Sequence, residues 1–219
     1  MVPTKPIYKE IFDIAREAIS IFNERGYECC LFGSAACSLY GVDRDPNDVD
    51  IIVLTEDDPE YLKHILCQES ASFSLVPSTK PWADYEVLWY KLLSQCRCKV
   101  DILIPGINHI PNMPPRRIRH PKGLPTLPIL PLLLLKLQGW SDHRRSRRKD
   151  FRAKIPVDVD DITELLERAC NCGTHLQSQS LRWLPKDFIK LAQRRVYRYV
   201  NKYPDSARKW ERLGFDAYR

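Results

Sequence analysis

The sequence contains no apolar run long enough to span a bilayer. Its most apolar segment, the Leu-rich run around residues 127–137, is interrupted by proline and is shorter than the roughly 20 residues that a transmembrane helix requires. The first residues also lack the regions of a signal peptide. We therefore expect a protein without membrane association, in the cytoplasm or alternatively in the nucleus, whose eight cysteines are reduced thiols.

Recognisable metal-ligand spacing is also absent among the cysteines and histidines. Cys96 and Cys98, like Cys170 and Cys172, are separated by one residue, whereas zinc sites usually separate paired cysteines by two and add histidines. The five histidines follow no ligand pattern, and no internal repeat or low-complexity tract is visible. These absences argue against a zinc domain and against a repeat architecture.

Charge is distributed unevenly along the chain, although the net charge is only +6. Residues 1–110 carry ten Lys and Arg against seventeen Asp and Glu, and residues 111–219 carry twenty-four against eleven. The acidic half holds the candidate carboxylates, and the other half is basic. Such a pair of halves would suit a metal-bound polyphosphate together with an anionic partner. The simpler interpretation is that the helical surfaces of the second half are charged.

The periodicity of apolar residues predicts an α/β region followed by a helical one. In residues 1–110 we expect helices at 7–22, 34–40 and 57–67, and strands at 28–32, 48–54, 85–92 and 98–104. The last two strands, joined by a short polar segment around Ser94 and Gln95, are predicted to form an antiparallel hairpin. Together the strands predict a mixed sheet of four to five strands flanked by helices.

A proline-rich segment, residues 105–131, is predicted to connect this core to the rest of the chain. Beyond it we expect helices near 128–139, 142–152, 158–172, 186–201 and 204–213. The fold class is therefore α/β (α+β), with a mixed-sheet core over residues 1–122 and a helical C-terminal lobe over residues 123–219.

Three acids form the candidate site. Asp48 and Asp50 stand at positions i and i+2 of a strand, so both side chains point to one face, about 7 Å apart. Asp101 begins a second apolar strand and would complete an oxygen-only cluster of the kind that Mg²⁺ prefers. Upstream, Gly33 and Ser34 form a strand-to-helix turn whose free N–H groups and hydroxyl would suit a phosphate.

These motifs resemble the DNA polymerase beta type nucleotidyltransferase superfamily. The resemblance is carried by Leu31-Phe32-Gly33-Ser34, by Leu39-Tyr40-Gly41, by Asp48-Val49-Asp50-Ile51-Ile52 and by Asp101. It covers roughly residues 28–155. Leu135-Lys136-Leu137 and Arg147-Arg148-Lys149-Asp150 are similar, more loosely, to the branch that holds abortive-infection toxin-type and aminoglycoside nucleotidyltransferases.

The resemblance implies transfer of a nucleoside monophosphate from an NTP, such as ATP, to an acceptor hydroxyl with loss of pyrophosphate. Asp48, Asp50 and Asp101 would be the catalytic residues and would hold two Mg²⁺ ions, with Mn²⁺ as the alternative. Gly33, Ser34, Lys136 and Lys149 would bind the substrate phosphates. The acceptor would be an RNA end, a protein or a small molecule.

Several features leave a second interpretation open. Members of such superfamilies lose catalysis, so the chain could instead be an inactive relative that binds a nucleotide, nucleic acid or a protein partner. Lys136, alone on an apolar helix, either meets an anion or extends to solvent. Residues 144–149 form a basic cluster that suits phosphate binding, nuclear import, nucleic acid or a solvated helix face. Trp183, Tyr197, Tyr199, Tyr203 and Trp210 suit either RNA stacking or a helical core.

Overall fold

The computed structural model describes residues 5–80, 83–92 and 96–218. The chain divides into two compact units, which we describe separately. The first comprises residues 1–39 and 43–127, and the second comprises residues 40–42 and 128–219. The predicted connection around Ser94 and Gln95 lies outside the described residues.

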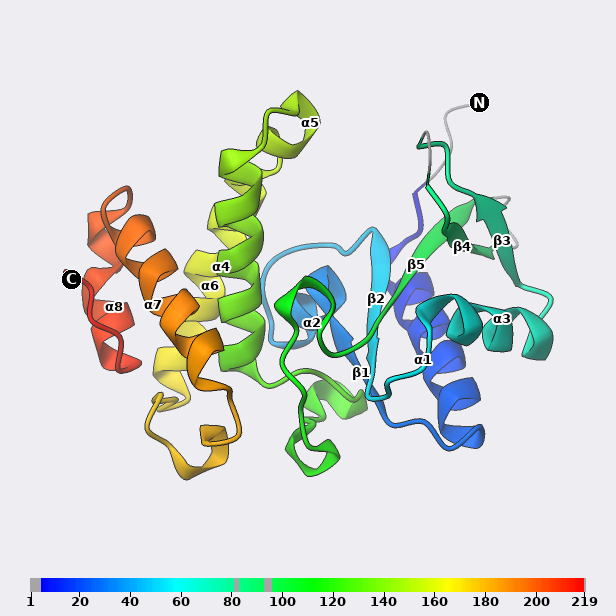
Figure 1. Cartoon of the computed structure of the whole chain (residues 1–219), viewed down its shortest axis with the longest axis horizontal. Helices are drawn as coiled ribbons and strands as arrows, with labels where there is room; N and C mark the ends of the chain where they lie inside the picture. Colours follow the sequence, from blue (N-terminus) through cyan, green and yellow to red (C-terminus); the bar gives the residue numbers. More distant parts are fainter. Residues whose placement is uncertain (1–4, 81–82, 93–95, 219) are drawn as a thin grey trace. The chain divides into compact units, whose positions relative to one another are not determined.

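The first unit is built on a mixed five-stranded sheet (Figure 1). Its strands are β1 (Cys29–Phe32), β2 (Asp48–Val53), β3 (Phe73–Pro77), β4 (Glu86–Lys91) and β5 (Arg97–Leu103). They lie in the order β1-β2-β5-β4-β3, and β2 and β5 are parallel while all other neighbours are antiparallel. The predicted antiparallel hairpin of β4 and β5 is confirmed.

Three helices accompany the sheet: α1 (Tyr8–Glu24), α2 (Gly33–Leu39) and α3 (Pro59–Glu69). α1 buries one apolar stripe, which includes Ile11, Ile14 and Phe22, and it contacts β1 and β2. α3 begins at Asp58, whose side chain accepts a hydrogen bond from the N–H of Glu60, and it contacts β3 and β5. α1 and α3 also contact each other, so they cover the same face of the sheet.

β3 was not predicted from the sequence. Only Phe73 of this strand is buried, because β3 is an edge strand that pairs with β4 alone. An edge strand with one solvated face needs few apolar residues, so its periodicity is weak.

The proline-rich connection is an integral part of the first unit. It contains three short 3₁₀ helices at Ile107–His109, Pro115–Arg117 and Pro121–Gly123. It then runs beside β1, where the N–H of Leu31 donates to Pro125 O (2.8 Å) and the N–H of Leu127 donates to Leu31 O (3.0 Å). These hydrogen bonds extend the first unit to Leu127.

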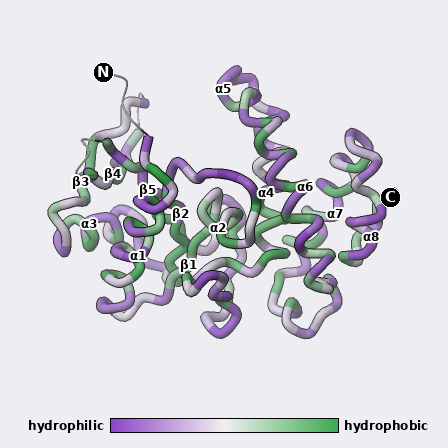
Figure 2. The backbone as a smooth tube through the Cα atoms, turned by 180° about the vertical axis from the view of Figure 1, so that it is seen from behind, coloured by the Kyte–Doolittle hydropathy of each residue, from purple (hydrophilic) through white to green (hydrophobic). Residues whose placement is uncertain are grey.

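The second unit is helical, with α4 (Ile129–Arg145), α5 (Lys149–Arg152), α6 (Ile155–Asn171), α7 (Lys186–Val200) and α8 (Ala207–Arg212), and with 3₁₀ turns at Gln179–Leu181 and Pro204–Ser206. α4 packs against α6 and α7, and α6 packs against α8. Residues 40–42 join this unit, where the Arg168 guanidinium donates to the carbonyl of Gly41. Apolar residues dominate α4 up to Leu137, as the hydropathy colouring shows (Figure 2).

The predicted helix at 142–152 is wrong, because the chain leaves the helical conformation at Ser146 (ψ 140°). The Ser146 hydroxyl accepts a hydrogen bond from the N–H of Arg148 (3.2 Å), a local bond that competes with the helix. The Arg152 guanidinium then donates to the carbonyls of Ser146 and Arg147. The segment is therefore the end of α4, a turn and the short α5.

Aromatic side chains form the core of the second unit. Tyr199 and Trp210 are 1 % and 0 % exposed, and the ring of Tyr199 contacts that of Trp140 edge-on, with centroids 4.9 Å apart. Buried rings cannot stack on RNA, so packing is the correct interpretation for these residues. Tyr197, in contrast, is exposed.

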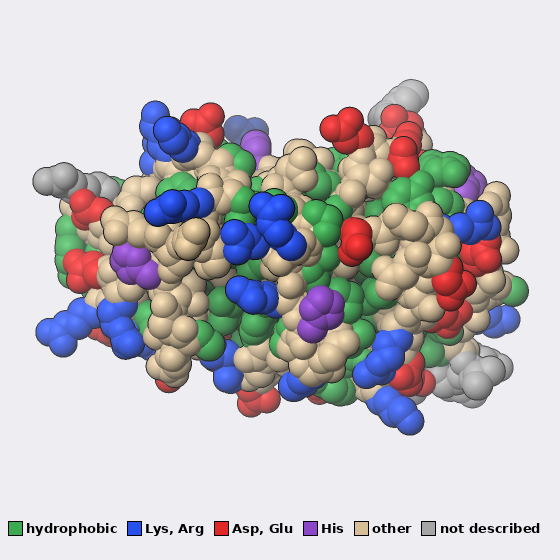
Figure 3. Space-filling view, turned by 90° about the horizontal axis from the view of Figure 1, so that it is seen from below, with side chains coloured by type: hydrophobic (Ala, Val, Ile, Leu, Met, Phe, Trp, Pro, Cys, Tyr) green, Lys and Arg blue, Asp and Glu red, His purple; other side chains and the backbone are tan. Residues whose placement is uncertain are grey.

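Charged side chains of both signs reach the surface, and Lys and Arg are numerous near the middle of the face in Figure 3. The basic cluster of residues 144–149 is mostly exposed, and Arg148 pairs with Asp150 (2.5 Å). Solvation thus accounts for most of the cluster, while its phosphate, nucleic-acid and import roles stay predictions. None of the described helices combines the length and the apolar character needed to cross a membrane.

Candidate active site

The site begins with the two aspartates of β2. Along this strand Asp48 and Asp50 are half-buried and alternate with Val49, which is fully buried. Because successive side chains of a strand point to opposite faces, Val49 packs on the helix-covered face and the two carboxylates share the other. This placement agrees with the expectation from their i, i+2 spacing.

β5 repeats the alternation and supplies the third acid. Cys98, Val100 and Ile102 are buried, while Lys99 and Asp101 are half-buried on the opposite face. The parallel pairing places Asp50 opposite Asp101 and Asp48 opposite Lys99. The three predicted carboxylates therefore lie on one face of two neighbouring strands, although their roles stay predictions.

Lys99 is a member of the cluster that the sequence analysis missed. Its Nζ donates to Asp101 Oδ2 at 2.5 Å. Burial lowers the pKa of Lys99, but the hydrogen bond to Asp101 and the charges of Asp101, Asp50 and Asp48 outweigh it, so that the pKa is raised. The available signal was its position two residues before Asp101, which places both side chains on one face.

The same charges act on a neighbouring thiol. The pKa of Cys98 is raised to about 12, first by burial and then by the negative charge of Asp48, with smaller effects of Cys96 and Asp50. Cys98 is buried on the face opposite to the carboxylates, and a thiol with this pKa stays protonated at neutral pH, as expected of a structural cysteine.

Gly33 and Ser34 contact the aspartates directly. Gly33 has φ +64°, and a Cβ atom built on it would lie 1.8 Å from Asp50 Oδ2. Only glycine allows this close approach of the carboxylate to the turn. The Ser34 hydroxyl is buried and donates to Asp48 Oδ1 at 3.1 Å. In the structure the Gly-Ser turn thus holds the two aspartates in place, and its predicted phosphate binding stays a prediction.

The chemistry of the three acids fits a divalent cation, because carboxylate oxygens are the ligands that Mg²⁺ and Mn²⁺ prefer. The arrangement is less complete. Within residues 5–80, 83–92 and 96–218, no three His, Cys, Asp or Glu side chains gather so that they could hold a metal ion. Asp101 is engaged by Lys99, and Asp48 is engaged by Ser34. A site formed by all three acids therefore requires their side chains to rearrange.

The two predicted lysines belong to the helical unit. Lys136 Nζ donates to Asp161 Oδ2 at 2.8 Å, and Asp161 is 1 % exposed, so Lys136 meets an anion of its own unit and does not extend to solvent. Lys149 begins α5 and is exposed. Phosphate binding by either lysine stays a prediction.

A second polar contact lies near Lys136 in the same helices. His143 Nδ1 and Asp158 Oδ2 are 2.6 Å apart, joining α4 to α6. Burial raises the pKa of Asp158, against the opposing effects of His143 and Lys136. The polar side chains between α4 and α6 therefore pair with one another inside the helical unit.

Comparison with known proteins supports the fold. The chain resembles the crystal structure of an antigenic nucleotidyltransferase-like protein from Paracoccidioides brasiliensis, with a TM-score of 0.66 and 15 % identity over 99 % of this chain and 97 % of that one. Terminal uridylyl transferase 4 from Trypanosoma brucei with bound GTP aligns more weakly, with a TM-score of 0.36 and 15 % identity over 91 % of this chain and 68 % of that one. No protein-family model and no curated protein matches the sequence. The chain has a nucleotidyltransferase-like fold, in which helices flank a mixed sheet.

Proposed function

We propose that the chain is a nucleotidyltransferase, which moves a nucleoside monophosphate from an NTP to an acceptor hydroxyl. The observation that carries this proposal is the placement of Asp48, Asp50 and Asp101 on one face of the parallel pair β2 and β5, with Gly33 against Asp50. The fold shared with a nucleotidyltransferase-like protein supports it.

In this reaction the acceptor oxygen forms a bond to the α-phosphorus, the bond from that phosphorus to its bridging oxygen breaks, and pyrophosphate leaves with the electron pair. Asp101 accepts the proton of the acceptor hydroxyl at a carboxylate oxygen. Asp48 and Asp50, positioned by Ser34 and Gly33, would hold Mg²⁺ or Mn²⁺. A bound cation would neutralise charge on the triphosphate and on the leaving oxygen.

Lys99 has a position suited to two tasks. Before substrate binds, its ammonium group neutralises part of the charge of three neighbouring carboxylates. When Asp101 turns toward the acceptor, Lys99 would be left to contact an anionic group of the substrate. The finer resemblance to the toxin-type and aminoglycoside branch is a further proposal that rests on residues 135–137 and 147–150.

One observation favours the second candidate, an inactive relative that binds nucleotide without transferring it. Asp101, the residue that would deprotonate the acceptor, forms an ion pair with Lys99. If that pair persists when an NTP binds, the positive charge of Lys99 makes Asp101 a weaker base. The two candidates therefore differ in turnover and not in nucleotide binding.

The test is incubation of the purified chain with each α-labelled NTP, Mg²⁺ or Mn²⁺, and separate pools of RNA, protein and small molecules. We expect label in one pool with the native chain and none with Asp48→Asn or Asp101→Asn. Asp13→Asn is the matched control, because Asp13 is exposed on α1, which covers the other face of the sheet. Metal-dependent NTP binding without transfer would overturn the proposal in favour of the inactive relative.

A further inference from the structure

A large cavity opens on the polar face of the sheet in the first unit. Its volume is about 1150 Å³, and β3, β4, β5, residues 78–80 and Tyr85 contribute to its lining. Asp101 and Lys99 belong to its wall, so the cavity begins where the carboxylate cluster ends. A group bound there would reach Asp101 without leaving the sheet.

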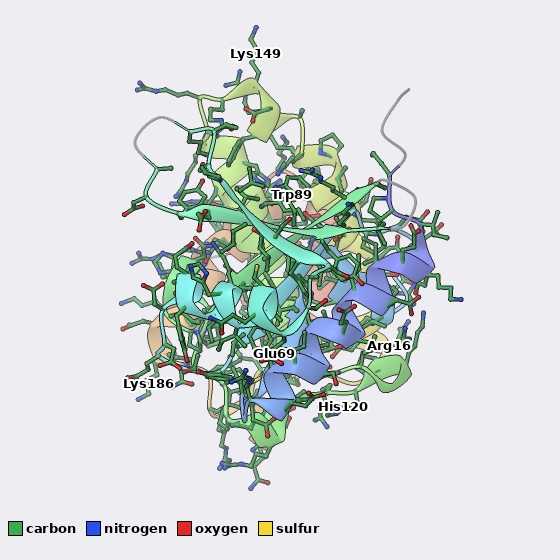
Figure 4. The ribbon with its side chains drawn as sticks, turned by 90° about the vertical axis from the view of Figure 1, so that its right-hand side faces the viewer. Arg16, Glu69, Trp89, His120, Lys149 and Lys186 are labelled. Atoms are coloured by element: carbon green, nitrogen blue, oxygen red, sulfur yellow. The ribbon has the colours of Figure 1, made fainter. Side chains whose placement is uncertain are left out.

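Aromatic side chains form part of this wall. Trp89 of β4 lies opposite Lys99 of β5 and is half-buried. Figure 4 shows Trp89 on the side of the sheet that α1 and α3 leave open. Tyr85, just before β4, is 37 % exposed, and the Nζ atoms of Lys63 and Lys80 each lie 5.8 Å from its ring centroid. The cavity thus offers two rings to a flat ligand.

The charge of the wall is positive. Five basic residues, Lys5, Lys63, Lys80, Arg97 and Lys99, line the cavity, against two acids, Glu86 and Asp101. Lys80 and Tyr85 are neighbours in the wall, and contact with Ser78 and Lys80 lowers the pKa of the Tyr85 phenol. Lys63 donates hydrogen bonds to Glu60 and to the carbonyl of Glu86. It therefore adds positive charge to the wall, while its ammonium group is held in place by these partners. An anionic ligand is favoured.

The composition of the wall, more than its size, favours a strand over a small anion. The volume of about 1150 Å³ is near the upper end of the range of small-molecule pockets, about 300–1000 Å³. Rings that accept bases together with cations that accept phosphates are the combination by which proteins hold single-stranded nucleic acid. Strand spacing places Trp89 about 8 Å from Asp101, one strand across and two residues along. A nucleotide on Trp89 would therefore have its sugar near Asp101.

We propose that this cavity holds the acceptor, and that the acceptor is the end of a single-stranded polynucleotide. Its terminal base stacks on Trp89, its phosphates meet Lys80 and Arg97, and its free hydroxyl lies at Asp101. This inference rests on the proposed function, because it assigns the acceptor of that reaction. RNA and DNA share the required chemistry, and the experiment separates them.

The first measurement is fluorescence anisotropy of labelled 12-nucleotide RNA, the same sequence in DNA, and a blunt duplex, without NTP. We expect single strands to bind more tightly than the duplex and Trp89→Leu to weaken binding about tenfold or more. Arg97→Gln should weaken binding and reduce its salt dependence by about one ion. A preference for the RNA strand over the DNA strand would show that the acceptor is RNA.

The matched controls lie on α1 and α3 and are not among the residues that line the cavity. Tyr61→Leu removes an exposed aromatic ring of α3, and Arg16→Gln removes an exposed cation of α1. Both should leave the affinity unchanged. If the single strand does not bind, or if Trp89→Leu binds as tightly as the native chain, the acceptor assignment is overturned.

The transfer assay separates this failure from failure of the proposed function. Label that enters only the protein or small-molecule pool, with dependence on Asp48, would keep the transferase and overturn the polynucleotide acceptor. Strand binding that depends on Trp89, with no Asp48-dependent transfer to any pool, would keep the cavity as a binding site and overturn the transferase. Transfer to the strand that is lost in Trp89→Leu and retained in Tyr61→Leu would support both.

Discussion

Gly33 is the position where adding one methyl group should most reduce both stability and transfer. Its φ of +64° strains any other residue by about 1–2 kcal/mol, and the new Cβ would also displace the Asp50 carboxylate. We expect Gly33→Ala to lower the melting temperature by several degrees and to reduce transfer about 100-fold. Thermal unfolding and the labelled-NTP assay measure the two effects.

Gly26→Ala separates strain from displacement. Gly26 has φ +80°, but a Cβ atom there would meet nothing within 4 Å. This variant should lose stability by a similar strain and keep full activity. Equal activity in Gly33→Ala and Gly26→Ala would contradict the expectation that displacing the Asp50 carboxylate impairs transfer.

Lys99 should compete with a cation for Asp101. Removing it in Lys99→Met leaves three carboxylates without their shared positive charge, so Mg²⁺ should stabilise the variant more than the native chain. The pair is more than a third exposed, so the expected gain in apparent Mg²⁺ affinity is only about two- to fivefold. Melting temperatures across a Mg²⁺ titration measure it.

Lys91→Met, which removes an exposed lysine at the end of β4, is the control for loss of a positive charge and should not change the Mg²⁺ response. An unchanged response in Lys99→Met as well would mean that the carboxylates do not bind Mg²⁺ together.

The Lys136–Asp161 ion pair links α4 to α6 across a buried surface. Lys136→Met should destabilise the chain by about 3–5 kcal/mol, because Asp161 then loses a charged partner while it stays buried. Replacing both residues, in Lys136→Met with Asp161→Leu, should restore much of the loss. Denaturant unfolding of the single and double variants measures the coupling.

The same variants test the predicted phosphate role of Lys136. If its main task is to pair with Asp161, the double variant should bind NTP as the native chain does. A double variant that is stable but needs much higher NTP would show that Lys136 meets the triphosphate.

Patterns confined to one element were predicted well. Asp48 and Asp50 alternate with buried apolar residues on β2, and the α1 stripe repeats every three to four residues, because strand and helix geometry impose these periods locally. β3 escaped because an edge strand buries little. The helix break at Ser146 escaped because one hydroxyl bond to the N–H of Arg148 decided it, without any change in the apolar pattern.

Thiol reactivity should report how the whole chain is packed. Cys172 is exposed, Cys67 is partly buried, and the other six cysteines are buried. We expect a thiol reagent at pH 7 to modify Cys172 quickly and Cys67 slowly, and all eight to react in denaturant. Raising the pH to about 9 should leave Cys29 unreactive, because burial raises the pKa of Cys29 to about 12.

Cys172→Ser is the control that should remove the fast phase alone. Two or more fast thiols in that variant would contradict the buried arrangement of Cys29, Cys98 and their neighbours. The absence of any fast phase in the native chain would contradict the exposure of Cys172.

The sequence alone determined the alternation of β2 and β5, the acidic triplet of candidates and the change from an α/β to a helical region, because these follow from the geometry of single elements. Only the tertiary structure decided that Asp101 lies opposite Asp50, that Gly33 touches Asp50, and that Lys99 forms an ion pair with Asp101. It also decided that Lys136 meets Asp161. Each of these contacts depends on pairing, register or packing between residues, and apart from Lys99 with Asp101 the partners are well separated along the chain. Such pairings are selected by burial of the whole core and leave no local pattern.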